Sequence, residues 1–263
     1  MDKPYSNFAY AELNLSFNKE LFVQEYDDQI FPSSQPFVDI YKNWELTEQY
    51  NSIWNIVPLD FYQTYAKDIT NRGPINGQTS QWDMVNLMRT ESNTTGIHEG
   101  GASWRNINRY NKTVVKDEFK NLEIVKWIYN NLSAERIIGM HCVSIEPGGF
   151  STIHRDMYWD KLTPNPAINN GFFQDGFVVV NINISSGGVP LRWCLDGNDI
   201  DTPRDTADLD CYIISDYFRH AVPMTTDRRR QIRVSLLPTK KLLNLINWTT
   251  AITLPNNYKF DTI

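Results

Sequence analysis

The stretch from Ile145 to Asp156, Ile-Glu-Pro-Gly-Gly-Phe-Ser-Thr-Ile-His-Arg-Asp, constrains the fold and chemistry of this chain more than any other. Apolar residues before Pro147 predict a strand over residues 137–146, the Pro-Gly-Gly predicts a turn, and a second strand is predicted over residues 150–156. Since residues two apart on a strand share a face, His154 and Asp156 point the same way. One metal ion can therefore bind both side chains.

A second histidine, His220, follows in Tyr-Phe-Arg-His-Ala-Val, far enough downstream for several strands to lie between. Two histidines and one carboxylate can hold three adjacent positions on a metal ion and leave the others open. That ligand set is typical of non-haem Fe(II) oxygenases. The sequence therefore predicts a metal centre formed by His154, Asp156 and His220, which would also be the catalytic centre.

The segment Gln231–Leu237 alternates between polar and apolar residues, as a half-buried strand does. Arg233 and Ser235 share one face of this strand, and the intervening apolar residues share the other. If His220 points inward, an inward-facing Arg233 on the neighbouring strand would offer a guanidinium group close to the metal. Such a group suits two-pronged binding of a carboxylate.

Each of these residues also has a commoner structural role: His154 as a buried histidine, Asp156 as a carboxylate that caps a turn, and Arg233 as half of an ion pair. Their joint occurrence in this order, on predicted strands, favours the metal centre over three separate structural roles. His98 and His141 receive no functional role, because the first lies in a predicted loop and the second on a predicted core strand.

The order Pro-Gly, His-x-Asp, a distant His and then Arg-x-Ser on the last strand resembles the Fe(II)/2-oxoglutarate-dependent dioxygenase superfamily, particularly its prolyl and aspartyl/asparaginyl hydroxylase-like branches. The resemblance covers residues 137–238. It implies that the three predicted ligands bind Fe(II). It also implies that Arg233 and Ser235 bind the distal carboxylate of the cosubstrate 2-oxoglutarate.

Two features of the sequence differ from the family pattern. His220 and Arg233 lie further apart than the family's usual spacing, so other arginines are alternative anchors for 2-oxoglutarate. These alternatives are Arg229 and Arg230. Aspartyl hydroxylase-like relatives also carry basic residues on the strand after His-x-Asp, whereas the corresponding strand here carries asparagines. The expected second contacts for the cosubstrate are therefore Asn181 and Asn183.

We therefore expect an oxygenase that hydroxylates an unactivated C–H bond with O2 and releases succinate and CO2, while the protein positions the reactants and excludes water. The rival hypothesis is a cupin-like protein that binds a metal or small ligand without turnover; a jelly-roll isomerase or a dioxygenase using another metal is a third. Arg233 favours the oxygenase, because a mere metal holder needs no inward arginine. The substrate stays open among small molecules, nucleobases, amino acids and peptides, since one fold hosts many substrates.

The chain is expected to be mainly β with flanking helices around a double-stranded β-helix, or jelly roll, because strands with tight turns outnumber helices. Helices are predicted over residues 58–69 and 116–132, and extended segments over the first 57 residues. We expect one compact domain with three parts. These are an N-terminal extension (1–135), the catalytic core (136–240) and a tail that folds back (241–263).

A net charge of −6 argues against general nucleic-acid binding, and the arginine run 228–230 is expected to be a solvated turn. The 3 cysteines are few and unpaired in spacing, which is typical of reduced, buried thiols. They are Cys142, Cys194 and Cys211. No leader sequence and no apolar run of membrane-span length is found, so a soluble, cytoplasmic protein is expected.

Tyr158 and Trp159 follow directly after Asp156, at the start of a connection over residues 157–176 that is rich in Pro, Asn and Gly. Large aromatic side chains beside a metal, on a segment able to move, are typical of a lid that closes over substrate. The alternative is that both rings pack against the N-terminal extension. We therefore predict Tyr158 and Trp159 as substrate-contacting residues.

Overall fold

The computed structural model describes residues 8–36, 79–90, 113–154, 178–188, 191–194, 202–204, 209–214, 219–222 and 225–253. These residues are mainly β with flanking helices, as the sequence predicts. The strands are β1 (Phe8–Leu13), β2 (Gln35–Pro36), β3 (Thr79–Asn86), β4 (Met88–Thr90), β5 (Thr113–Val115), β6 (Ala134–His154), β7 (Val178–Ser186), β8 (Leu191–Cys194), β9 (Thr202–Arg204), β10 (Cys211–Ile214), β11 (Arg219–Val222), β12 (Arg229–Pro238) and β13 (Ile246–Thr253). The helices are α1 (Lys19–Glu25), α6 (Glu123–Asn131) and α7 (Lys240–Leu243), with a π-helical turn (Tyr26–Ile30) and two 3-10 turns (Phe31–Ser33 and Asp117–Phe119).

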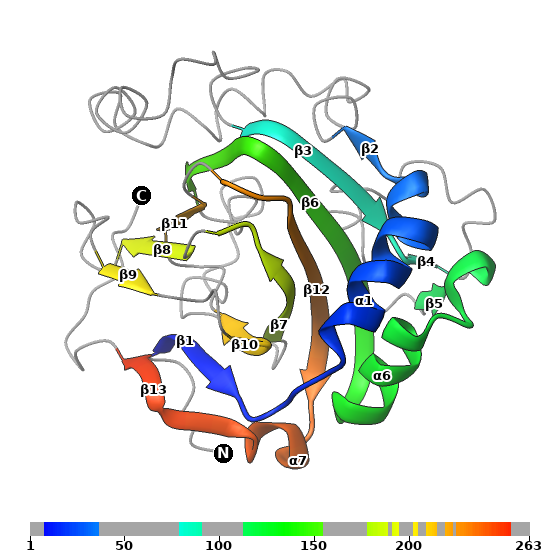
Figure 1. Cartoon of the computed structure of the whole chain (residues 1–263). Coiled ribbons are helices and arrows are strands. Elements are labelled where there is room, and N and C mark those ends of the chain that lie inside the picture. The colour runs from blue at the N-terminus through cyan, green and yellow to red at the C-terminus, as the bar shows by residue number, and fades with distance from the viewer. Residues whose placement is uncertain are drawn as a thin grey trace, which may run out of the picture.

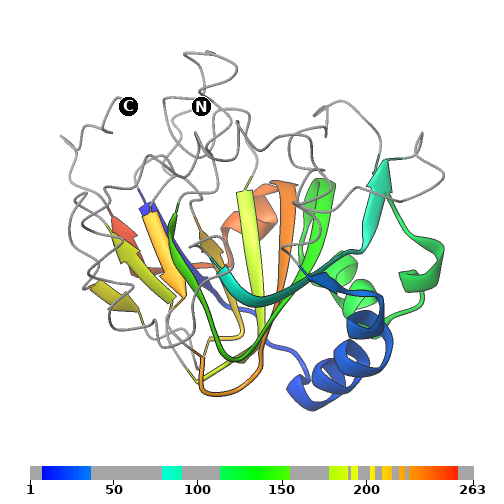
Figure 2. The ribbon, with the colours of Figure 1, turned by 90° about the horizontal axis from the view of Figure 1, so that it is seen from above.

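Eleven of these strands form one antiparallel sheet. Its main path runs β13-β1-β10-β7-β12-β6-β11-β8-β9, and β3 joins at β6 and carries β2. Strands β4 and β5 pair separately. Figures 1 and 2 show that the sheet is curled, with α1 and α6 on the outer side of β6 and β12. The sheet therefore has an outer face covered by helices and an inner face on the concave side.

Strand β6 differs from the sequence prediction, which placed a turn between two separate strands. The structure has one strand that runs through the Pro-Gly-Gly segment, where Gly148 adopts a φ of 79°. This left-handed conformation favours glycine and bends the strand without ending it. Residues 219–238 follow the bend, because β11 pairs with β6 beyond Gly148 and β12 pairs with β6 before it. Thr225 joins the two by exchanging backbone hydrogen bonds with Gly148 (2.7 Å) and Gly149 (2.9 Å).

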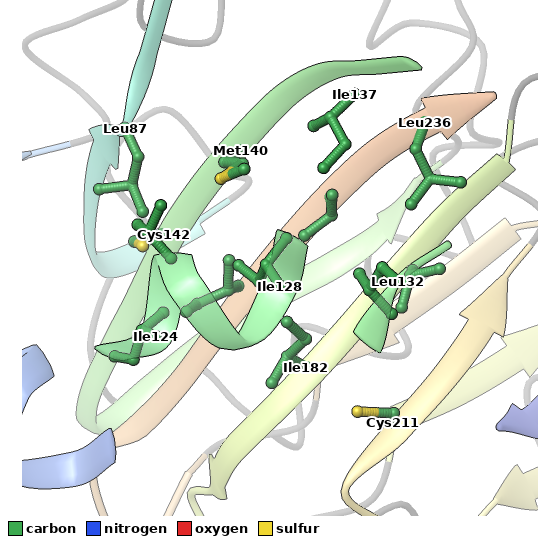
Figure 3. Packing of buried hydrophobic residues seen from close by; sticks show 14 of the residues in the cluster. Leu87, Ile124, Ile128, Leu132, Ile137, Met140, Cys142, Ile182, Cys211 and Leu236 are labelled. Atoms are coloured by element: carbon green, nitrogen blue, oxygen red, sulfur yellow. The ribbon is translucent and has the colours of Figure 1, made fainter. Parts of the chain in front are cut away.

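The hydrophobic core lies between the outer face of the sheet and the helices. On β12, Ile232, Val234 and Leu236 are fully buried, which confirms the face predicted from alternation. Figure 3 shows Ile124 and Ile128 of α6 among the buried side chains of β6 and β7. The apolar face of the sheet therefore binds the helix layer, and the polar face is left for the concave side.

Helix α6 is shorter than predicted. The sequence predicts a helix from residue 116, but the structure has a 3-10 turn and then α6 from Glu123. Glu25 explains the start: its two carboxylate oxygens accept hydrogen bonds from the backbone N–H groups of Glu123 and Ile124, both at 2.7 Å. The first turn of α6 is thus bound by a side chain from α1, far away in sequence.

The N-terminal region also differs from its prediction as extended segments. Residues 8–36 contain strand β1 and helix α1, whose first turn is capped by Asn18, with its side-chain oxygen accepting from the N–H of Leu21. Stacking of Phe17 on Phe22, and edge contacts of both with Trp127, attach α1 to α6. The helix predicted over residues 58–69 lies outside the described residues.

Residues 239–253 follow the last core strand, β12. They form α7 and then β13, which pairs with β1, so the two ends of the described chain lie side by side in the sheet. Cys142 and Cys211 are buried and free, and burial raises the pKa of both thiols. Within the described residues, no helix is both long and apolar enough to cross a membrane.

Candidate metal centre

The two predicted histidine ligands lie on neighbouring strands. His154 is the last residue of β6, and the β11–β6 register places His220 directly opposite it. Directly opposed residues of an antiparallel pair share a face, with Cβ atoms about 5 Å apart. The sequence spacing alone predicted only that a distant strand would bring the second histidine close. The structure places the two positions in direct register.

The third predicted ligand, Asp156, lies outside the described residues, two positions beyond the end of β6. Within the described part of the chain, no group of three His, Cys, Asp or Glu side chains is placed to hold a metal ion. Of the predicted metal centre, the structure therefore gives the backbone positions of the two histidines and not that of the aspartate.

A row of polar residues crosses the inner face of the sheet from β3 to β10. Neighbours in the row lie directly opposite each other on adjacent strands. The row consists of Asn86, His141, Arg233, Asn181 and Tyr212. Four of these are buried, with exposures from 0% to 7%, and Arg233 is partly exposed. A buried polar row is costly unless its groups are hydrogen-bonded, and this row gives the inner face its polar character.

His141 was left without a role by the sequence, and the structure puts it in this row. Its Nδ1 lies 2.9 Å from Oδ1 of Asn86, and both side chains are buried. The register places Arg233 directly on its other side. Alternation along β6 could have revealed this, because His141 lies on the same strand face as Gly139 and Val143, which also belong to the inner face.

Tyr212 is a second residue that the sequence analysis missed. Its hydroxyl oxygen accepts hydrogen bonds from Nε2 of Gln231 at 2.6 Å and from Nη2 of Arg229 at 3.5 Å. Burial raises the pKa of Tyr212, although the charges of Arg229 and Arg233 partly offset this effect. The hydroxyl is therefore protonated at neutral pH. Because its oxygen already accepts from two donors, its proton is available to an acceptor such as a carboxylate.

Two further polar atoms flank Arg233. Ser235 is 3% exposed and Asn181 is 1% exposed. Among the described residues, neither Oγ of Ser235 nor Oδ1 of Asn181 has a hydrogen-bond partner. Asn183 differs, because its Nδ2 donates to the backbone oxygen of Leu209 at 3.1 Å. Of the sequence-predicted cosubstrate residues, Arg233, Ser235, Asn181 and Asn183 thus lie on the inner face.

The two alternative arginines have different environments. Arg229 is 1% exposed, lies on the inner face, and donates from Nη1 to the backbone oxygen of Ser186 at 3.0 Å. Arg230 lies on the outer face and makes a two-pronged contact with Asp27, at 2.8 Å from Nε and 2.6 Å from Nη2. Arg230 is therefore directed away from the face that carries Arg233.

The prediction that the arginine run is a solvated turn is wrong. Arg228 binds Oε1 of Glu146 at 2.6 Å, lies 3.5 Å from Asp27, and places its guanidinium carbon 4.5 Å from the centre of the Phe31 ring. With Arg229 buried and Arg230 bound to Asp27, all three arginines are fixed. Local sequence around the arginines contains no sign of these contacts, because Asp27 lies about two hundred residues earlier.

The structure does not describe every residue predicted for the site. Tyr158, Trp159 and the connection over residues 157–176 lie outside the described residues, as does His98. The lid stays a prediction. For Cys194, on β8, the structure describes the backbone position alone.

No family model and no curated protein matches the chain. Several solved structures are similar to it at low levels, among them the following three. A prolyl-4-hydroxylase from Pseudomonas putida is 11% identical over 84% of this chain and 100% of its own, with a TM-score of 0.32. A 2OG-Fe(II) oxygenase family oxidoreductase from Burkholderia pseudomallei is 11% identical over 66% and 77%, with a TM-score of 0.34. A Shewanella oneidensis protein named as an oxygenase is 13% identical over 93% and 87%, with a TM-score of 0.29.

Proposed function

We propose that this protein is an Fe(II)- and 2-oxoglutarate-dependent oxygenase that hydroxylates an unactivated C–H bond of a small molecule, an amino acid or a peptide. The observation that carries the proposal is the direct register of His220 with His154 on β11 and β6. With Asp156, which follows His154 by two residues in the sequence, these positions would supply two imidazoles and one carboxylate to a metal ion, the donor set that suits Fe(II). Bound iron would activate O2, with release of succinate and CO2 from the cosubstrate.

The inner face supplies the groups that a dicarboxylate cosubstrate needs. We propose that Arg233 binds the distal carboxylate with its guanidinium group, and that Ser235 and Tyr212 donate hydroxyl protons to it. Asn181, directly opposite Arg233, and Asn183 extend this polar surface. Arg229 is the second candidate anchor on this face. Arg230 is not proposed, since Asp27 binds it on the outer face.

The protein's own contribution is to orient and enclose the reactants. Strand β6 pairs with β11 beyond the bend at Gly148 and with β12 before it, so backbone pairing to one strand sets the relative positions of His154, His220 and Arg233. We propose that this curled antiparallel sheet is a double-stranded β-helix core over residues 136–240. Tyr158 and Trp159 are proposed to close over the substrate and keep water out.

The test is the anaerobic binding of Fe(II) and 2-oxoglutarate, followed by the visible charge-transfer absorption of their complex. Wild-type protein should develop this absorption, and His154→Ala, Asp156→Ala and His220→Ala should each lose it. Succinate formation from 2-oxoglutarate under O2, screened across pools of small molecules, amino acids and peptides, then identifies the substrate.

Lys126→Gln is the control, because Lys126 is exposed and pairs only with Glu123 among the described residues. Unchanged iron affinity in His220→Ala would disprove the proposed ligand set. Metal binding by the wild type with no affinity for 2-oxoglutarate would instead identify a cupin-like binding protein without turnover.

A further inference from the structure

The arginine run at the start of β12 connects the proposed cosubstrate site to the N-terminal region. Alternation along the strand places Arg229 on the inner face with Arg233, and Arg230 on the outer face. Asp27, in the π-helical turn, binds Arg230 through both carboxylate oxygens. The side chain of Arg230 is 14% exposed and that of Asp27 31%, so the pair is largely shielded from solvent.

The contact lies at an irregularity of the sheet. The β12–β7 register shifts between Arg230 and Gln231, whereas the β12–β6 register is regular there. The extra residue is on β7, between Asn183 and Ser185. A bulge of this kind bends the strand locally and changes the direction of the side chains that follow it. The bulged strand β7 carries Asn181 directly opposite Arg233, two residues before Asn183, so the geometry that Arg230 and Ser185 hold at the bulge affects the strand beside which the Arg233 guanidinium group lies.

Further hydrogen bonds fix the bulge from the β7 side. Oγ of Ser185 donates to the backbone oxygen of Arg228 at 2.8 Å, and Nη1 of Arg230 donates to Oγ of Ser185 at 3.2 Å. Arg230 therefore links β7 and the π-helical turn through one side chain. Of these two contacts, the one with Asp27 is charged and two-pronged, and such contacts restrict the orientation of a guanidinium group most strongly.

We propose that Asp27 is a positioning residue for the cosubstrate: by holding Arg230 at the bulge, it sets the orientation in which Arg233 binds the distal carboxylate. This inference rests on the proposed function. It assigns to the N-terminal region, which the sequence analysis left without a role, a specific part in the reaction. In this proposal Asp27 touches neither iron nor 2-oxoglutarate and acts through its two-pronged contact with Arg230, which is shorter than its 3.5 Å contact with Arg228.

The experiment compares Asp27→Asn, Arg230→Gln and their double variant with wild type in the anaerobic 2-oxoglutarate titration. Each single variant should raise the dissociation constant for 2-oxoglutarate about tenfold, and the double variant should be no weaker than either, since both break the same contact. Iron affinity should stay within about twofold, and KM for 2-oxoglutarate should rise with kcat nearly unchanged. Asp27→Glu, which keeps a two-pronged carboxylate, should recover most of the affinity.

Asp117→Asn is the matched control, because Asp117 forms an exposed ion pair with Lys120 away from β12. An unchanged dissociation constant in Asp27→Asn overturns the inference. So do fully additive effects in the double variant, or a parallel loss of iron affinity and thermal stability.

A second measurement does not depend on the proposed function. The side-chain Nε–H resonance of Arg233, observed by 1H–15N NMR in the protein without cosubstrate, should shift in Asp27→Asn and Arg230→Gln and stay fixed in Asp117→Asn. If the resonance shifts while the wild type binds no 2-oxoglutarate, the proposed function fails and the coupling of Asp27 to Arg233 stands. An unshifted resonance disproves the coupling whatever the protein binds.

Discussion

Alternation of polar and apolar residues along the strands predicts the face of some inner-face residues and not of others. Arg233 and Ser235 were predicted to share a face because they alternate with Ile232, Val234 and Leu236, and the complete burial of those three confirms it. Tyr212 gave no such signal, since all four residues of β10 are buried and the strand reads as uniformly apolar. Its position next to Asn181 follows from strand pairing between distant segments, which one sequence does not encode locally.

Arg233→Gln should weaken 2-oxoglutarate binding about a hundredfold. Loss of a charge-assisted, two-pronged contact costs about 3 kcal/mol, which corresponds to that factor. Iron binding should be unchanged, because Arg233 lies on β12, whereas the two predicted histidine ligands lie on β6 and β11. Anaerobic titration measures both affinities. If Arg233→Gln binds normally and Arg229→Gln does not, the anchor is Arg229.

Asp83 should make the free energy of unfolding fall as pH rises, the opposite of the usual effect of an aspartate. Burial, and next the charge of Glu146, raise the pKa of Asp83, while Arg228 lowers it. The folded state therefore binds the proton more tightly than the unfolded chain does, so this group lowers stability as pH rises from the ordinary aspartate pKa through the raised one. Asp83→Asn removes the titrating group. It should stabilise the protein at pH 7 relative to wild type and lose that advantage at pH 4.

Urea unfolding of both proteins at the two pH values provides the check. Asp117→Asn is the comparison. Its effect on the free energy of unfolding should depend on pH in the opposite direction, because hydrogen bonding to Lys120 lowers the pKa of the exposed Asp117. If the free energies of unfolding of Asp83→Asn and wild type differ by the same amount at both pH values, the prediction is contradicted.

At the scale of elements, the start of α6 depends on a residue from another helix. Glu25→Ala leaves the N–H groups of Glu123 and Ile124 without their charged acceptor, and we expect a loss of about 2 kcal/mol in the free energy of unfolding. Glu25→Gln keeps one oxygen and should lose about half as much. Urea unfolding followed by circular dichroism measures both. Equal stability of Glu25→Ala and wild type would show that water replaces the carboxylate without cost.

The turn after β7 depends on glycine. Gly188 has a φ of +76°, and a Cβ built there would lie 2.0 Å from Oγ1 of Thr226. Gly188→Ala should therefore destabilise the protein by about 2 kcal/mol through backbone strain and this collision. Gly139→Ala is the matched control, because its Cβ would meet Cε1 of His141 at an ordinary 3.5 Å. Thermal unfolding of the two variants compares them directly. Similar melting temperatures of the two variants would contradict the prediction that the turn requires glycine at position 188.

Strand β6 and helix α6 are two elements whose bounds differ from the sequence prediction. The Pro-Gly-Gly segment predicts a turn because glycine and proline usually end strands. In the structure β6 continues through it, because β3 pairs with β6 on both sides of the bend, β12 before it and β11 after it. The start of α6 was misplaced for a related reason, since its capping group comes from Glu25. Both errors concern contacts between distant segments, which local propensity does not contain.

For the whole molecule, the ends of the described chain are part of the sheet. Removing everything after Pro238 deletes the buried Leu242 and Ile246 together with strand β13, and it exposes the edge of β1. Each buried side chain contributes about 2 kcal/mol, and total stabilities are typically about 5–15 kcal/mol. The truncated chain should lose cooperative unfolding and be cleaved rapidly in limited proteolysis. Trp248→Ala, at an exposed position of β13, should unfold cooperatively like wild type.

The pairing of β1 has a consequence for synthesis on the ribosome. The backbone N–H of Glu12 donates a hydrogen bond to Oγ1 of Thr250, 238 residues later, and the other neighbour of β1 is β10. At about 5–20 residues per second, β1 leaves the ribosome on the order of 10–50 s before its last partner is made. During that time Phe-Ala-Tyr-Ala-Glu-Leu is an unpaired, mostly apolar strand, a target for chaperones and for association between nascent chains.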